Sequence, residues 1–262
     1  MKLGIIAPPV EESFKSAQQR GLDFLEFTIN IEYNTDEFFA SVPSLREWSK
    51  KYNVGVGSIG RWGTDKIDSK GNIIKEELEI SYKLIEAASE LGCDNFVTGC
   101  NYNENMSYFD NCKAAIEFLS LLLEKGSEKG VKISTYNCRW NNFIVENMSW
   151  TIVHGHLKDL GIKFDPSHSR YYGGDYLKEA MEWGDRFYHV HLKGSLVLNG
   201  DRFDDPPAGM DETNWGAFIS VLYAKKYDRC LSIEPHSSTW AGELGEKGVD
   251  FTIKYFRNLI FR

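Results

Sequence analysis

Three short motifs in the second half of the chain carry side chains suited to metal-assisted chemistry. They are the D-x-x-H motif of Asp165 and His168, the H-x-H-L-K motif that begins at His189, and the I-E-P-H motif that contains Glu234. Carboxylate and imidazole groups together make the mixed oxygen and nitrogen ligand set that Mn²⁺, Mg²⁺ or Zn²⁺ accepts. If the three motifs meet in space, they predict a divalent-metal site.

Each motif follows a short apolar run, and such runs recur along the chain, each succeeded by an amphipathic stretch. The expected strands are residues 3–6, 24–27, 54–59, 95–98, 131–136, 162–164, 187–191 and 230–233. Strands that alternate with helices imply parallel pairing and right-handed crossovers. Eight strand–helix pairs in 262 residues predict an α/β fold, a (β/α)8 TIM barrel forming a single domain over residues 1–262.

The expected helices show apolar residues at helical spacing. One of them opens near Pro43, because proline suits a first helical turn. The clearest runs from Ile74 to Ala88, with charged residues on its other face. The remaining helices are expected over residues 11–20, 114–123, 148–160, 176–183, 215–225 and 249–259.

A barrel of this kind places its chemistry where the strands end, so the three motifs are expected at one mouth. Side chains alternate along a strand, and His189 and His191 therefore share a face. His191 stands at the strand end, and we expect His189 one layer deeper, hydrogen-bonded.

Taken together, the three motifs resemble those of the xylose-isomerase-like TIM barrels, as does the stretch from Pro207 to Trp215. That superfamily includes sugar and sugar-phosphate isomerases, ketose 3-epimerases, inosose dehydratases and family 2 AP endonucleases. The resemblance implies that Asp165, His191 and Glu234 are ligands of a divalent metal (Mn, Mg or Zn). It also implies that His168 contacts the substrate beside the metal, with Lys193 as a polar or charged group nearby.

The sequence departs from the family at the end of the fifth strand, where the family has a glutamate that is both ligand and base. Tyr136 stands at that position, and its phenol is a poor ligand when protonated. Asn137 would offer a neutral amide oxygen if the register shifts by one residue. A two-carboxylate epimerase is then harder to support than an isomerase, in which Glu234 is the base and Lys193 or Tyr136 the proton donor.

Residues that follow other strands are expected to contact a sugar, by ring stacking or by hydrogen bonds to hydroxyl and acid groups. In addition to His168, the expected sugar contacts are Arg61, Trp62, Asn101, Asn137, Trp140, Arg170 and His236. Arg170 is the residue expected to bind an anion. The predicted partner is therefore a small-molecule sugar or polyol.

Several alternatives stay open at this point. Asp165 and His168 could form a structural hydrogen-bonded pair, and Trp62 and Trp140 could simply cap the core. Glu26 lines the pocket by resemblance, but an ion pair is as plausible. The whole protein could be a catalytically impaired barrel that binds a carbohydrate, or a lyase, dehydratase or epimerase of the same superfamily. A DNA-repair endonuclease ranks last, because it needs further metal ligands and a basic face.

Composition narrows the partners and the compartment. The formal net charge of −8 argues against a nucleic-acid surface, and an anionic substrate would need a local cationic group. No run approaches the ~20 apolar residues of a membrane span. Five scattered cysteines fit reduced thiols, so a cytoplasmic location is expected. A homodimer or homotetramer is expected from the frequency of closed assemblies.

Overall fold

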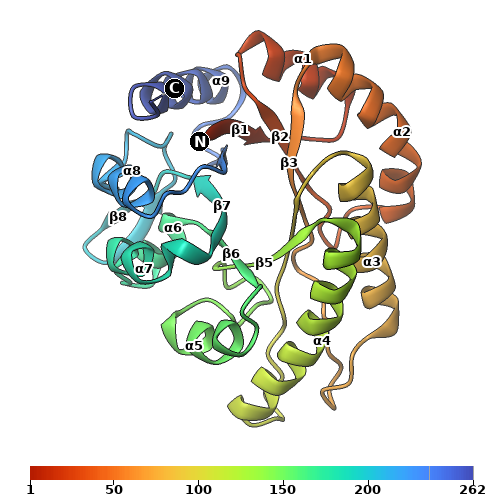
Figure 1. Cartoon of the computed structure of the whole chain (residues 1–262). Coiled ribbons are helices and arrows are strands. Elements are labelled where there is room, and N and C mark those ends of the chain that lie inside the picture. Colours follow the sequence, from red (N-terminus) through yellow and green to blue (C-terminus); the bar gives the residue numbers. More distant parts are fainter. Residues whose placement is uncertain (236, 262) are drawn as a thin grey trace.

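Eight parallel strands close into a barrel (Figure 1). The structure is a computed structural model that describes residues 1–235 and 237–261. The barrel order is β1-β10-β7-β6-β5-β4-β3-β2, so strands that follow each other around the barrel also follow each other in the chain. The strands are β1 (Lys2–Ile6), β2 (Phe24–Thr28), β3 (Gly55–Gly60), β4 (Asn95–Thr98), β5 (Lys132–Tyr136), β6 (Gly161–Phe164), β7 (Phe187–Leu192) and β10 (Cys230–Ile233).

Helices surround the barrel, and the main apolar core lies between the helices and the strands. The longer helices are α1 (Glu11–Gln19), α2 (Thr35–Tyr52), α3 (Lys75–Glu90), α4 (Tyr108–Lys129), α5 (Asn147–His156), α7 (Tyr176–Trp183), α8 (Trp215–Ala224) and α9 (Gly242–Arg257). Buried side chains such as Leu25, Phe96 and Phe118 join strands and helices in one cluster. The predicted (β/α)8 barrel is confirmed.

The start of α2 differs from the prediction, which put it near Pro43. The helix begins at Thr35, because the side chain of Asn34 caps it by accepting hydrogen bonds from the amides of Asp36 and Glu37. Acidic residues in the first turn also favour this start. Pro43 consequently lies inside the helix. Capping residues, and not the proline, decided the boundary.

Two small elements at the carboxyl end of the barrel have no counterpart in the predicted pattern. The helix α6 (Pro166–Tyr171) follows β6, and the strands β8 (Leu196–Leu198) and β9 (Asp201–Asp204) form an antiparallel hairpin after β7. Each is too short for a periodic apolar pattern to show in the sequence. Both supply residues to the site.

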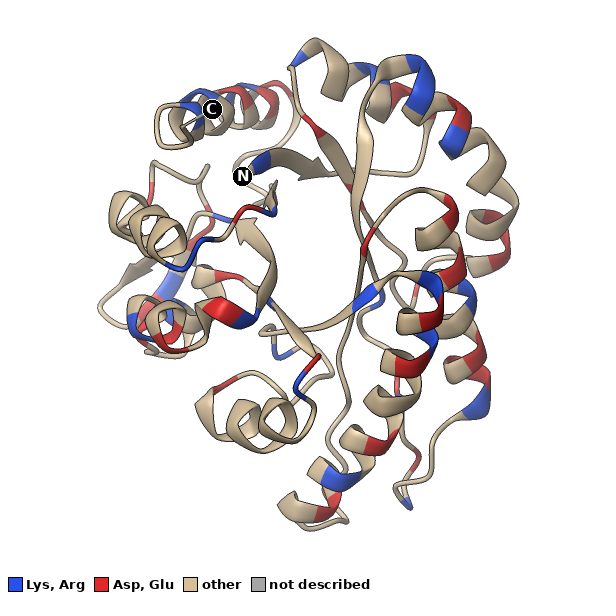
Figure 2. Ribbon diagram, in the orientation of Figure 1, with Lys and Arg blue, Asp and Glu red and all other residues tan. Residues whose placement is uncertain are grey.

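The outer helices α3 and α4 carry interspersed acidic and basic residues, as Figure 2 shows. Charges mixed in this way are typical of helix faces in contact with water. Among the residues that the structure describes, no helix combines the length and the apolar character that crossing a membrane requires.

Candidate active site

Three side chains meet at the carboxyl end of the barrel. Asp165 follows β6, His191 lies near the end of β7, and Glu234 follows β10. His191 Nδ1 is 2.5 Å from Glu234 Oε2 and 4.0 Å from Asp165 Oδ2. One donor atom from each residue lies within 4.8 Å of the other two. Parallel strands end at the same rim, so residues far apart in the sequence converge there.

Asp165 is held in place by hydrogen bonds to both its side chain and its backbone. Its Oδ1 accepts a hydrogen bond of 2.9 Å from the amide of Ser167 and caps α6, with Pro166 in the first turn. The side chain of Asn137 donates to the Asp165 carbonyl and accepts from the Asp165 amide, both at 2.9 Å. The second carboxylate oxygen of Asp165 is thereby directed toward His191.

His191 is oriented from below by a buried carboxylate. Its Nε2 lies 2.9 and 3.0 Å from the two carboxylate oxygens of Glu26 on β2. His189 Nε2 lies 2.7 Å from Glu26 as well, so His189 is buried and hydrogen-bonded one layer deeper, as expected. A histidine ring held by a carboxylate at one nitrogen has its other nitrogen correctly placed to bind a metal.

The charge states follow from burial and from neighbouring groups. Burial raises the pKa of Glu234, but the charges of Lys193 and His191 outweigh it and hold the pKa well below the ordinary value. Burial likewise opposes the charged form of Asp165, whereas the neighbouring His168 and Lys163 lower its pKa. Both carboxylates are therefore ionised at neutral pH and able to accept a cation or a proton.

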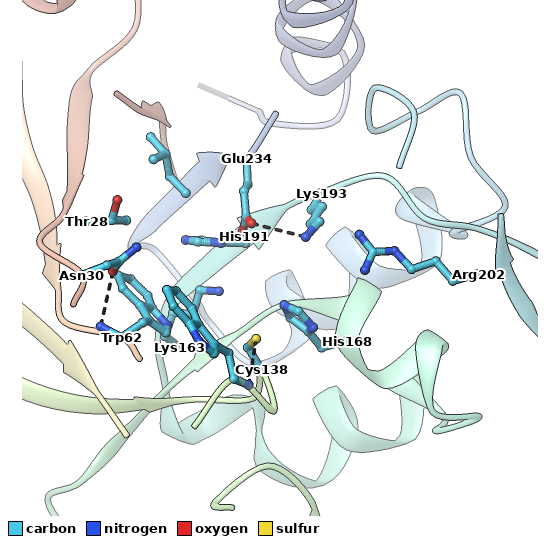
Figure 3. A pocket seen from close by; sticks show the side chains of 12 residues that line it. Thr28, Asn30, Trp62, Cys138, Lys163, His168, His191, Lys193, Arg202 and Glu234 are labelled. Carbon is cyan, nitrogen blue, oxygen red and sulfur yellow. Dashed lines mark hydrogen bonds and ion pairs between the residues drawn. The ribbon is translucent and has the colours of Figure 1, made fainter. Parts of the chain in front are cut away.

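A cavity of about 350 Å³ opens above these groups. It falls within the ~300–1,000 Å³ typical of small-molecule sites. Figure 3 shows Glu234, His191 and Lys193 along one side, with Trp62, Lys163, Cys138 and His168 along the other. Its lining also includes Ile6, Thr28, Asn30, Trp140 and Arg202.

The residues present suit a divalent metal. Asp165 Oδ2 is buried and has no hydrogen-bond partner among the described residues. A buried carboxylate oxygen without a partner is costly, and a cation at that point would offset the cost. Two carboxylate oxygens and one imidazole nitrogen form a donor set that Mn²⁺, Mg²⁺ and Zn²⁺ accept. Asp165, His191 and Glu234 are the residues that could hold the ion.

Tyr136, at the position of the family's glutamate, is directed elsewhere. Its hydroxyl donates to the carbonyl of Trp140 at 2.9 Å, and its ring packs 5.4 Å from that of Trp62. The absence of a side chain at Gly99 makes room, since a Cβ there would lie 2.8 Å from the phenol carbon. Burial raises the pKa of Tyr136 well above its ordinary value. The structure does not place Tyr136 among the residues that line the cavity.

Several predicted substrate contacts are engaged with the protein itself. Asn101 fixes the loop that leads to α3, by accepting from the amides of Lys66 and Ile67. Arg170 donates to Ser195 and to Glu212, at 2.9 and 2.8 Å. The amide of Asn137 is used by Asp165, as described above. Each of these side chains positions a part of the rim instead of lining the cavity.

Other predicted contacts do face the cavity. His168 lies 3.6 Å from Asp165 Oδ2, and it lines the cavity together with Trp62 and Trp140. Gly60 allows Trp62 to lie over the barrel, because a Cβ at Gly60 would come 1.8 Å from its ring. His236 lies outside the described residues.

Among the lining residues that the sequence did not lead us to expect, two are charged. Lys163 stands two residues before Asp165 on β6, so strand alternation alone would have placed both on the inner face. Arg202 comes from the hairpin strand β9, for which the sequence has no comparable signal.

A closed barrel with two carboxylates and a histidine at its carboxyl end defines the class of protein. It is a TIM barrel with a candidate divalent-metal site. The family model of the xylose isomerase-like TIM barrel matches residues 14–259, and the chain belongs to that family.

The chain has distant relatives. It is 23% identical to YfiH, an uncharacterized protein of Bacillus subtilis (strain 168), over 90% of this chain and 91% of that protein. It is also similar to the structure of a 3-keto-D-glucoside 4-epimerase from E. coli, with 16% identity and a TM-score of 0.77 over 98% and 99% of the two chains. A D-allulose 3-epimerase from Methylomonas sp. superposes with a TM-score of 0.79 at 15% identity over 99% and 98%. At sequence identities this low, the structural similarity supports the fold alone.

Proposed function

We propose that the chain is an enzyme of the sugar isomerase/epimerase type, which moves a proton at a carbon next to a carbonyl group of a sugar or sugar derivative. The observation that carries this proposal is the buried Asp165 Oδ2, which has no hydrogen-bond partner in the described part of the chain and meets His191 and Glu234 beside an open cavity. The family, and the sugar epimerases among its structural neighbours, support the same class of reaction.

Asp165, His191 and Glu234 would hold a divalent ion. When bound, the ion polarises a substrate carbonyl and stabilises the negative charge that develops on its oxygen. Glu26 contributes by fixing the ring of His191 from the opposite side. Trp62 and Trp140 offer ring faces to the substrate, and His168 a hydrogen-bonding group.

Glu234 is the base in this proposal. Its carboxylate is ionised, lines the cavity and is fixed by contacts with His191 at 2.5 Å and Lys193 at 3.3 Å. It takes the proton from the carbon next to the carbonyl and returns it to the former carbonyl carbon. Lys193 on the same side donates a proton to the former carbonyl oxygen and recovers one from the neighbouring hydroxyl group. The structure offers no such path from Tyr136, whose hydroxyl is bound to Trp140.

A shift of the carbonyl group between neighbouring carbons requires one base on one face of the sugar. Inversion at a carbon normally requires a base on each face. In the described part of the chain, Glu234 is the carboxylate that lines the cavity. We therefore propose an isomerase in preference to an epimerase.

Deuterium uptake from heavy water tests the proposal. The full-length protein with Mn²⁺ is incubated with a panel of aldoses and ketoses, and the sugars are analysed by NMR and mass spectrometry. We expect deuterium at the carbon next to the carbonyl in at least one sugar, together with its isomer.

The alternative function is a barrel that binds a carbohydrate without turnover, which the substitution of Tyr136 for the family's glutamate favours. Sugar binding without exchange would support that alternative and contradict the enzyme. Loss of water from the sugar would indicate a dehydratase.

A further inference from the structure

Lys163 is a buried cation that the mechanism above does not use. It lies on the inner face of β6, in register with Tyr136 on β5 and His189 on β7. Its side chain is 2% exposed, yet it lines the cavity. A lysine in this position is costly, because taking an ammonium group out of water must be offset by hydrogen bonds or opposite charge.

The ammonium group of Lys163 has no hydrogen-bond partner among the residues that the structure describes. In the described part of the chain, Asp165 Oδ2 is the carboxylate oxygen with which it pairs, at 3.9 Å, which is beyond hydrogen-bonding distance. Its other neighbour is the ring of Trp62, with Nζ 6.0 Å from the centroid. Asp165 Oδ2 itself has no hydrogen-bond partner within residues 1–235 and 237–261. Lys163 thus lines the cavity with three N–H donors, and none of the described residues accepts a hydrogen bond from them.

The other cations at the cavity differ in this respect. Lys193 donates to Glu234 at 3.3 Å and lies 3.8 Å from Asp205. Arg202 pairs with both carboxylate oxygens of Asp205. Lys193 and Arg202 therefore have carboxylate partners within hydrogen-bonding distance, whereas the carboxylate that Lys163 pairs with is 3.9 Å away, which leaves its N–H donors available to a ligand.

We propose that Lys163 is a substrate-binding residue that takes an anionic oxygen of the sugar and makes the site selective for acidic sugar derivatives. An anionic oxygen offsets the burial of an ammonium group better than a neutral hydroxyl does, because a hydrogen bond between two charged groups is stronger. The chain's formal net charge of −8 repels an anion, so a local cation is required to hold one. Trp62 beside Lys163 supplies a face for the sugar ring.

This inference rests on the proposed sugar-binding function, and calorimetry separates the two. The full-length protein with Mn²⁺ is titrated with D-glucose and D-fructose as neutral sugars, D-glucuronate as a carboxylate, and D-glucose 6-phosphate and D-fructose 6-phosphate as phosphates. We expect at least one acidic sugar to bind about tenfold tighter than the neutral sugars. Comparing glucuronate with the phosphates identifies the source of the anionic oxygen.

Three variants assign the preference to a residue. Lys163→Met keeps most of the unbranched side chain without its charge, and it is expected to lower the affinity for the acidic sugar about tenfold while leaving neutral sugars unaffected. Lys163→Arg should retain the preference. Arg170→Met removes the nearby cation that is paired with Glu212, and the preference should survive it. Retention by Lys163→Met with loss in Arg170→Met would overturn the proposal.

The remaining outcomes are equally decisive. Equal binding of acidic and neutral sugars by the wild type overturns the role of Lys163 but leaves the proposed function standing. Binding of neither kind overturns both. If Lys163→Met does not fold, as judged by circular dichroism, a crystal structure of the wild type with glucuronate or a sugar phosphate decides. An acid group in contact with Lys163 Nζ supports the proposal, and an acid group bound elsewhere overturns it.

Discussion

Two clusters of buried charge lie near the carboxyl end of the barrel, and they are built differently. One joins Arg61, Lys66 and Glu77 between β3 and α3. The Arg61 guanidinium donates to both carboxylate oxygens of Glu77, at 2.8 and 3.0 Å, and Lys66 donates to the same carboxylate at 2.6 Å. Thr64 donates to Glu77 at 2.8 Å as well. Every charged group in this cluster has a close partner.

The other cluster contains Lys163, Asp165, His191 and Glu234. Here Asp165 Oδ2 has no hydrogen-bond partner among the described residues, and its distances to Lys163 and His191 are 3.9 and 4.0 Å. The cavity adjoins this cluster. A satisfied cluster of buried charge stabilises a loop, whereas an unsatisfied one beside a cavity is ready to receive a ligand. This difference separates Arg61, an expected sugar contact, from Lys163, which no prediction included.

The largest expected effect is the loss of activity in Glu234→Gln. The amide keeps the shape of the side chain but cannot accept a proton, so kcat should fall by about 10²–10⁴-fold. Initial rates are measured on the sugar that exchanges deuterium, with circular dichroism to verify folding. Glu243→Gln, on the exposed surface of α9, is the matched control and should match the wild type. Retained turnover in Glu234→Gln would exclude the assignment of the base.

Glu77→Gln tests the satisfied cluster. It leaves Arg61 and Lys66 buried without their counter-charge, and the free energy of unfolding should fall by about 3–5 kcal/mol. Urea denaturation, monitored by fluorescence, measures this loss of unfolding free energy. The exposed neighbour Glu76 is the control, since Glu76→Gln should change stability by less than about 0.5 kcal/mol. If Glu77→Gln were fully stable yet inactive, the cluster of Arg61, Lys66 and Glu77 would be part of the active site. The distinction between a structural cluster and a ligand-binding cluster would then be wrong.

The buried histidine His154 is a further buried polar group with close partners, and it should make the stability of the fold depend on pH. Burial lowers its pKa to about 3, and it contacts Thr135 at 2.9 Å and the Leu160 carbonyl at 3.1 Å. The unfolded chain binds the proton more readily, so this stabilisation is present above pH 6.5 and is lost as the pH falls toward 3. Between pH 7 and pH 4 the contribution amounts to about 3 kcal/mol.

Denaturation of the wild type and of His154→Gln at several pH values measures this effect. The glutamine does not titrate, so the variant should lose less stability on acidification by about that amount. Parallel curves for the two proteins between pH 4 and pH 7 would contradict the assignment.

The smallest expected effect concerns the carboxylate beneath His191. Glu26→Gln removes the charge that orients the ring, and the affinity for Mn²⁺ should fall by about 10–100-fold. Burial opposes the charged form of Glu26, but His191 and His189 outweigh it and keep its pKa well below the ordinary value. Calorimetric titration with Mn²⁺ reports the change without reference to activity. An unchanged affinity would show that Glu26 serves the fold alone.

Much of this protein could be predicted from local patterns. The eight apolar runs, the amphipathic stretches between them and the count of strand–helix pairs indicate the barrel, because each depends on residues close in the sequence. Strand ends bearing Asp165, His191 and Glu234 were expected to meet, since parallel strands share one rim. In the structure they do meet, within 4.8 Å. Their role as metal ligands stays a prediction.

Only the tertiary structure decided which polar side chains face the cavity. Asn101, Asn137 and Arg170 stand at suitable points in the chain, but each finds its hydrogen-bond partners within the protein. Among the described residues, Lys163 finds no hydrogen-bond partner and pairs with Asp165 at 3.9 Å. Whether a polar group is satisfied depends on residues that are distant in sequence, as Glu26 shows beneath His191. Local sequence patterns do not reveal such partners, because the packing of the whole barrel determines which side chains meet.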